Sequence, residues 1–177
     1  NREKGVFTFH VYDKEGHLRE TRTANNTLTT QGALRILTLT FSTASADTIY
    51  TGLISNTGSP VVAEGNTATG MRLEGASSTP NGWVETDNAG FSARATPGSQ
   101  TFGSNSVSWN EASYTMSGAS ADIAGAFVMN TSVQSTTSAG NNVSGDTLYA
   151  CALFAGGDLT IEDGETIKVT FDMTLNS

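Results

Sequence analysis

The sequence predicts an all-β protein, a two-sheet antiparallel sandwich of Ig-like or jelly-roll type with an N-terminal hairpin and one short helix. Three observations support this prediction. Several short segments alternate apolar and polar residues, as strands with one buried face do. Turn-forming residues separate these segments, and 19 of the 177 residues are glycine. One segment has the apolar spacing of a helix, which leaves about eight short strands to build a single domain over residues 1–177.

The N-terminal hairpin is predicted over residues 1–26. Its first strand alternates polar residues with apolar residues that are expected to face the core, namely Phe7, Phe9 and Val11. A turn at residues 13–16 leads into a second strand at about residues 17–24. Because Leu18 is the only large apolar residue of that second strand, we expect the strand to lie at a sheet edge.

The predicted helix spans about residues 30–39. Leu34 and Leu37 are three residues apart, which is the spacing of neighbours on one helix face. A threonine hydroxyl, from Thr29 or Thr30, is expected to cap the first turn.

Residues 55–105 are predicted to form long loops with short strands, because glycine, proline and asparagine interrupt every candidate element. A strand at residues 48–54 precedes these loops, and a brief strand is expected at residues 83–85. Phe91 and Phe102 are expected to anchor the second half of this segment to the core.

The most regular strands are predicted in residues 106–177. They are expected at residues 107–116, 123–129, 148–154 and 166–175. The first of them should contain a bend or bulge near residues 110–112, and the next two are typical of buried strands. The last strand alternates apolar and polar residues throughout, so we expect one face in the core and the other in water.

The charge of the chain argues against binding to nucleic acid. The net charge is −8 and the pI is about 4.5, whereas binding to phosphates depends on many lysine and arginine residues. Six of the nine basic residues lie in the first 35 positions, namely Arg2, Lys4, Lys14, Arg19, Arg22 and Arg35. This asymmetry is compatible with docking of the N-terminal region on an acidic neighbour, but ordinary solvated charges on a hairpin are the favoured interpretation.

The sequence indicates neither a membrane span nor secretion. No run approaches 18 apolar residues, and the first residues lack the apolar stretch of a signal peptide. Cys151 is the one cysteine, so it has no partner for an internal disulfide, and its apolar surroundings favour a small buried thiol over a reactive one. The cytosol of a producing cell would suit such a chain.

No catalytic, cofactor-binding or metal-binding residue is predicted, and the chain is not expected to be an enzyme. The two histidines, His10 and His17, both lie in the first hairpin, and the chain contains no G-x-S-x-G nucleophile motif. His10 shares a strand face with Thr8 and Tyr12, so it is expected to be a packed or surface residue rather than a base. Neither a zinc-binding Cys/His cluster nor a Gly-rich phosphate loop occurs.

Four carboxylates gather around one predicted turn, namely Asp158, Glu162, Asp163 and Glu165. They could bind a calcium ion if backbone carbonyls joined them, but their order matches no EF-hand loop. A solvated acidic turn is the simpler interpretation.

Each tryptophan precedes a glutamate by two positions, as Trp83 with Glu85 and Trp109 with Glu111. Two carboxylates that meet in space could cleave a glycoside, and sandwich folds host such enzymes. In a chain with only 15% charged residues, these pairs more often belong to strands whose side chains face opposite ways.

Four segments of the chain resemble, in the same order, a family of small tailed-bacteriophage proteins that are usually encoded among the virion structural genes. The segments are residues 5–16; residues 26–34; residues 50–53 with 67–68, 83–85 and Arg94; and residues 123–127 with 145–150 and 162–169. The long Ser/Thr/Gly-rich stretches near residues 75–105 and 130–145 depart from the family pattern.

The resemblance implies a structural component of a tailed-phage particle, most specifically a capsid decoration or cement protein that binds the outside of the head. Its expected partners are the major capsid protein or other virion proteins, with further copies of itself in a homo-oligomer, and without nucleic acid or membrane. The expected location is the virion, assembled in the host cytoplasm. The loops near residues 56–82 and 86–105 and the basic hairpin are the expected contacts.

Two other functions remain open at this point. A receptor- or carbohydrate-binding module of a tail or fibre is suggested by long loops that carry Trp83 and Phe91, and it requires exposed aromatic side chains. A small hydrolase using Glu85 or Glu111 is the weakest alternative, since it requires two carboxylates that converge in a cleft.

Overall fold

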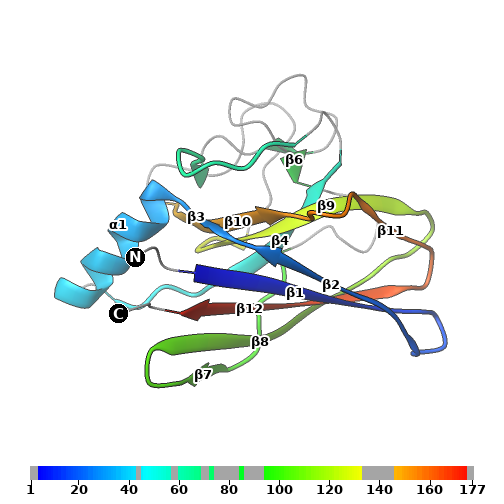
Figure 1. Cartoon of the computed structure of the whole chain (residues 1–177), viewed down its shortest axis with the longest axis horizontal. Coiled ribbons are helices and arrows are strands. Elements are labelled where there is room, and N and C mark those ends of the chain that lie inside the picture. Colours follow the sequence, from blue (N-terminus) through cyan, green and yellow to red (C-terminus); the bar gives the residue numbers. More distant parts are fainter. Residues whose placement is uncertain are drawn as a thin grey trace.

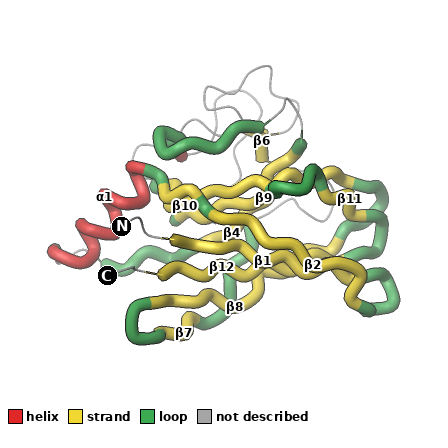
Figure 2. The backbone as a smooth tube through the Cα atoms, in the orientation of Figure 1, coloured by secondary structure: helices red, strands yellow, loops and turns green. Residues whose placement is uncertain are grey.

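The computed structural model describes residues 4–42, 45–56, 60–68, 72–73, 84–85, 94–132 and 146–174. In these residues the chain forms two sheets that pack face to face, with a single helix at one end (Figures 1 and 2). Neighbouring strands are antiparallel in every described pair except β5 with β6. The predicted all-β sandwich is therefore confirmed.

The first sheet has the strand order β2-β1-β12-β8-β7. Its strands are β1 (Lys4–Tyr12), β2 (Leu18–Asn25), β7 (Gln100–Phe102), β8 (Ser106–Thr115) and β12 (Thr166–Thr174). The predicted hairpin is confirmed, and β2 lies at the sheet edge as expected. Strand β1 pairs along its whole length with β12, where Phe7 stacks close to Phe171 with ring centroids 4.7 Å apart. Phe7, Phe9 and Val11 are fully buried.

The second sheet has the order β3-β10-β9-β4-β6-β5, with β11 paired to β9. Its strands are β3 (Thr27–Leu28), β4 (Tyr50–Ser55), β5 (Arg72–Leu73), β6 (Val84–Glu85), β9 (Ala121–Met129), β10 (Leu148–Leu153) and β11 (Leu159–Ile161). Residues 60–68 cover the outer face of this sheet, where Ala68 and Val62 pack against Phe127. Because both faces of β9 and β10 are covered, these strands are almost entirely apolar instead of alternating, with the exposed Asp122 near the start of β9 as the exception.

Helix α1 (Thr30–Phe41) closes one end of the sandwich, beside the start of β1 and the end of β12 (Figure 1). Thr29 is its N-cap, and the Thr29 hydroxyl accepts a hydrogen bond from the Gly32 backbone N–H at 2.9 Å. Gly32 lies directly on β10, and a β-carbon there would collide with the backbone of Tyr149. This close approach fixes the helix against the second sheet.

The structure corrects two details of the sequence interpretation. The described residues contain twelve strands instead of about eight, because pieces of two or three residues such as β3, β7 and β11 are too short to show a period. Phe102 was expected to anchor a loop to the core, but it is 74% exposed. It lies opposite Val107 in β7, which is the edge strand of the first sheet among the described residues. Phe91 and Trp83 lie outside the described residues.

Candidate interaction surface and apolar cavity

Helix α1 carries two apolar stripes on opposite sides. Gly32, Ile36 and Leu39 face the sandwich, where Gly32 is buried and the other two are partly buried. Leu34, Leu37 and Phe41 are 66%, 55% and 82% exposed. At about 100° per residue, the two sets point in opposite directions from the helix axis. We call the exposed set, Leu34, Leu37 and Phe41, the outer stripe.

The outer stripe is electrically neutral. The one charged residue of α1 is Arg35, which is paired with Asp47 at 2.5 Å. Beside the stripe, the Thr38 hydroxyl donates to the Leu34 carbonyl at 2.9 Å, and Thr40 makes the same bond to Ile36. Because each of these hydroxyls already has a partner within the helix, covering them costs less than covering a polar group that depends on water.

The inner side of the helix is attached by a network around Asp47, in the segment before β4. Arg35 Nε donates to Asp47 at 2.8 Å, and the Tyr149 hydroxyl donates to the same carboxylate. The hydrogen bonds from Arg35 hold the pKa of Asp47 below its ordinary value. Burial, together with the Asp47 charge, raises the pKa of Tyr149 above its ordinary value. The carboxylate is therefore ionised at neutral pH and ties α1, β10 and the chain before β4 together.

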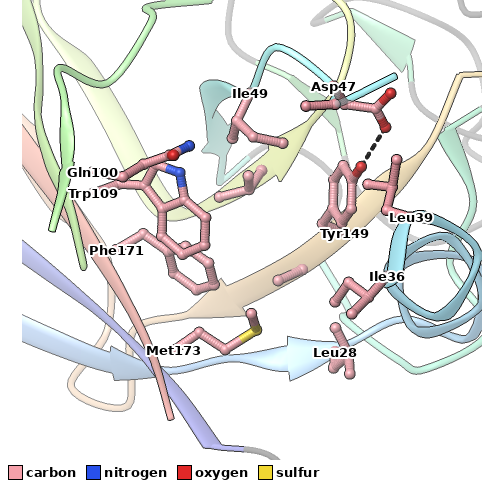
Figure 3. Close-up of a pocket in the computed structure, with 13 residues that line it drawn as sticks. Leu28, Ile36, Leu39, Asp47, Ile49, Gln100, Trp109, Tyr149, Phe171 and Met173 are labelled. Carbon is pink, nitrogen blue, oxygen red and sulfur yellow. Dashed lines mark hydrogen bonds between the residues drawn. The ribbon is translucent and has the colours of Figure 1, made fainter. Parts of the chain in front are cut away.

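An apolar cavity of about 210 Å³ lies beneath the inner side of α1, between the two sheets (Figure 3). Its walls come from every layer of the fold, namely Leu28, Ile36, Leu39, Ala46, Asp47, Ile49, Gln100, Trp109, Val128, Tyr149, Ala150, Phe171 and Met173. Ala46 and Gln100 are exposed, so they mark the side on which the cavity reaches solvent.

Trp109 forms one wall of the cavity and stacks on Phe171, with ring centroids 5.1 Å apart (Figure 3). Its Nε1 atom is buried and has no hydrogen-bond partner among the described residues. Indole N–H groups inside proteins are usually hydrogen-bonded. This donor is therefore an unsatisfied group on the cavity wall, beside the side chain of Gln100, the cross-strand partner of Trp109 (Figure 3).

A bulge in β8 separates Trp109 from Glu111. Between Val169 and Phe171 the pairing advances two residues along β12 but three along β8, which confirms the bulge predicted near residues 110–112. Glu111 therefore faces outward and forms an ion pair with Lys168 at 3.0 Å, while Trp109 faces the interior. The backbone of Glu85 is described but its side chain is not, so the predicted pair of Trp83 with Glu85 lies outside the described residues.

Three of the four carboxylates of the acidic turn are used in separate structural contacts, while Glu162 is exposed. Glu165 accepts two hydrogen bonds from Arg19 at 2.7 Å, and Asp163 accepts one from the Gly118 backbone N–H at 2.5 Å. Asp158 lies 3.3 Å from the Asn56 side-chain amide. The described part of the chain contains no group of three or more His, Cys, Asp or Glu residues that could hold a metal ion.

The two arginines of β2, Arg19 and Arg22, are likewise used within the fold. Arg19 also donates to the Thr160 carbonyl at 2.7 Å, and Arg22 donates to the Gly157 and Asp158 carbonyls. With Arg35 bound to Asp47, three of the six N-terminal cations hold other parts of the chain. This finding weakens the expectation that the basic hairpin docks on an acidic neighbour.

The remaining residues of interest are placed as follows. His17 is exposed and lies 3.3 Å from Asp13, whose pKa is lowered by the His17 backbone N–H. His10 has a buried Nδ1 that lacks a hydrogen-bond partner within the described ranges. Cys151 is fully buried, as predicted, and burial raises the pKa of its thiol to about 12.

The outer stripe and the cavity were not anticipated from the sequence. A helix that is apolar on two opposite sides is the signal that could have revealed the stripe, since a helix with one covered side needs only one apolar face. The cavity could not be found this way, because its walls come from segments far apart in the sequence. No described helix is long and apolar enough to span a bilayer. Comparison with known proteins finds no matching family model, no similar curated protein and no similar solved structure.

Proposed function

We propose that this chain is a non-enzymatic structural subunit of a tailed-phage particle, a decoration or cement protein that binds the outside of the head. The outer stripe of α1 is the observation that carries the structural part of this proposal. Three large exposed apolar side chains on one uncharged face of a helix are typical of a surface that binds another protein. The resemblance of four ordered sequence segments to phage structural proteins supplies the kind of assembly.

The outer stripe is the contact through which copies of this chain associate. Its residues are spaced by three and then four positions, which is the repeat with which one helix packs against another. In a symmetric pair every charged residue near the axis meets its own copy, so a chain of net charge −8 needs an uncharged contact. The outer stripe meets this requirement, and two α1 helices would pack across the symmetry axis.

We assign the contacts with the major capsid protein or other virion proteins to the loops near residues 56–82 and 86–105. This assignment remains a prediction. A decoration subunit binds a shell at many repeated positions, so modest contacts become strong when several copies are joined. The proposed location is therefore the virion, after assembly in the host cytoplasm.

The carbohydrate-binding alternative is less favoured, because sugar stacking needs an aromatic face that is open to solvent. Trp109 is turned into the sandwich and stacks on Phe171. This leaves Trp83, outside the described residues, as the tryptophan that such a function would require.

The proposal is tested by electron cryo-microscopy of isolated phage heads mixed with the purified protein. We expect density in a regular lattice on the head, with neighbouring copies touching through α1. Phe41→Ser should weaken self-association by about tenfold or more, because one large apolar side chain is lost from each copy. Leu18→Ser is the matched control, since Leu18 is 55% exposed on β2, away from the helix.

Density confined to the tail, or no binding to heads, would contradict the decoration role. Equal self-association of wild type, Phe41→Ser and Leu18→Ser in analytical ultracentrifugation would contradict the role of the outer stripe. Binding to the head and self-association through the outer stripe are therefore tested by separate measurements.

A further inference from the structure

We propose that the cavity beneath α1 is a binding site for a small, neutral, largely apolar molecule that carries one hydrogen-bond acceptor. An aromatic or alicyclic ketone is the simplest member of this class. The site is independent of the outer stripe, which lies on the opposite side of the helix.

The size and walls of the cavity set the apolar part of the ligand. Its volume is about 210 Å³, and Ile36, Val128 and Phe171 represent the three layers that line it. An apolar cavity of about 150 Å³ in a protein core stays dry and binds benzene. The cavity of this chain therefore has room for a molecule somewhat larger than benzene, of about eight or nine non-hydrogen atoms by the same comparison.

Trp109 sets the polar part of the ligand. Its buried Nε1 finds no hydrogen-bond partner in the part of the chain that the structure describes, and an indole nitrogen is a donor only. The complementary group is therefore an acceptor, such as a carbonyl oxygen. Phe171 stacks on the same indole and holds its orientation, so the donor is fixed before the ligand arrives.

The charges around the cavity exclude an anionic ligand. Asp47 is paired with Arg35, so the ion pair carries no net charge. The residues that line the cavity include no lysine or arginine that could bind an anion. A water molecule is a poor substitute for the ligand as well, since a buried water needs two to four polar partners and most of the residues that line the cavity are apolar.

Solvent reaches the cavity at Ala46 and Gln100, which are both exposed. A ligand that enters there passes between the chain before β4 and the edge strand β7. In the proposed pose its acceptor lies toward the indole and its apolar part toward Ala150 and Ile36.

The test is a two-dimensional ¹H–¹⁵N spectrum that records the backbone amides together with the tryptophan side chains, titrated with acetophenone and with isopropylbenzene. The two probes have similar shapes, but only acetophenone has a carbonyl oxygen. Trp109→Phe identifies the Trp109 signal and also removes the donor while keeping an aromatic wall. We expect both probes to bind, and acetophenone to bind about threefold to tenfold more tightly while moving the Trp109 N–H signal downfield. In Trp109→Phe this preference should disappear while binding of isopropylbenzene persists.

Two further variants distinguish loss of the binding site from loss of the fold. Ala150→Val should abolish binding of both probes, because its added methyl groups occupy the cavity. Ala152→Val, two residues further along β10 and outside the cavity wall, is the matched control and should bind like wild type. Thermal unfolding of each variant shows whether it remains folded at the titration temperature.

Failure of both probes to shift any cavity signal of the wild-type protein up to their solubility limits would overturn the binding site. Equal affinity of the two probes, with no movement of the Trp109 N–H signal, would overturn the assignment of the acceptor. Neither result bears on decoration of the phage head, which is measured separately.

Discussion

Helix α1 can approach β10 closely at Gly32 because glycine has no β-carbon that would collide with the backbone of Tyr149. Alanine is about 1 kcal/mol more favourable than glycine within a helix, so helix propensity alone predicts that Gly32→Ala stabilises the protein. Packing predicts the opposite, because a β-carbon at this position collides with the Tyr149 backbone. Backbone atoms of a paired strand cannot move aside as a flexible side chain can. We expect Gly32→Ala to lower the free energy of unfolding by about 1–3 kcal/mol.

Urea denaturation at neutral pH measures this change, and Gly65→Ala is the control. Gly65 has no heavy atom within 4 Å of an added β-carbon, so its substitution should change the free energy of unfolding by less than about 0.5 kcal/mol. A Gly32→Ala variant that is as stable as wild type would mean that α1 does not rest on β10.

The sequence predicted the burial of a residue correctly where that burial depends only on the pattern of its own strand. The burial of Phe7, Phe9 and Val11 follows from alternation within one strand. The inward orientation of Trp109 required the bulge in β8, which the sequence predicted without showing to which side it turns the indole. Phe102 was misplaced because its exposure depends on β7 being the last strand of its sheet, which no local pattern records.

Helix α1 was predicted as an element, and its attachment can be tested at Thr29. The Thr29 hydroxyl accepts from the Gly32 N–H and donates to the Leu148 carbonyl, and Thr29 is fully buried. Thr29→Ala removes both bonds and leaves a buried donor and a buried acceptor unsatisfied. We expect a loss of about 2–3 kcal/mol in the free energy of unfolding, above the ordinary cost of a lost cap. Thr29→Ser keeps the hydroxyl and should lose less than about 1 kcal/mol.

Hydrogen exchange locates the effect of Thr29→Ala. Amide protons of α1 should exchange faster, while those of β1 and β12 keep the protection of the global fold. Equal losses of stability in Thr29→Ala and Thr29→Ser would show that the methyl group, rather than the hydroxyl, holds the helix.

Whether each of the other elements could be predicted depends on how clearly its burial pattern appears in the sequence. Strand β12 was predicted because it has one buried and one wet face, so its alternation is complete. Strands β3, β7 and β11 were not predicted, because two or three residues carry no period and their pairing is decided by distant partners. The two stripes of α1 are both apolar, so the sequence does not tell which stripe the sandwich covers.

At the scale of the whole molecule, the proposed self-association depends on the balance of charge repulsion and apolar contact, which respond differently to salt. The chain has a net charge of −8, so approaching copies repel each other, whereas the outer stripe is neutral and apolar. Raising the NaCl concentration from about 0.02 M to about 0.5 M shortens the Debye length from above 20 Å to about 4 Å and screens the repulsion. The apolar contact is not weakened by this screening. We therefore expect the association constant to rise by several-fold over this range, as measured by sedimentation velocity. Phe41→Ser should associate about tenfold or more weakly than wild type at both salt concentrations, because screening removes repulsion but does not replace the lost apolar contact. Association that weakens as salt rises would mean that charged residues hold the copies together, and it would exclude the outer stripe as the contact.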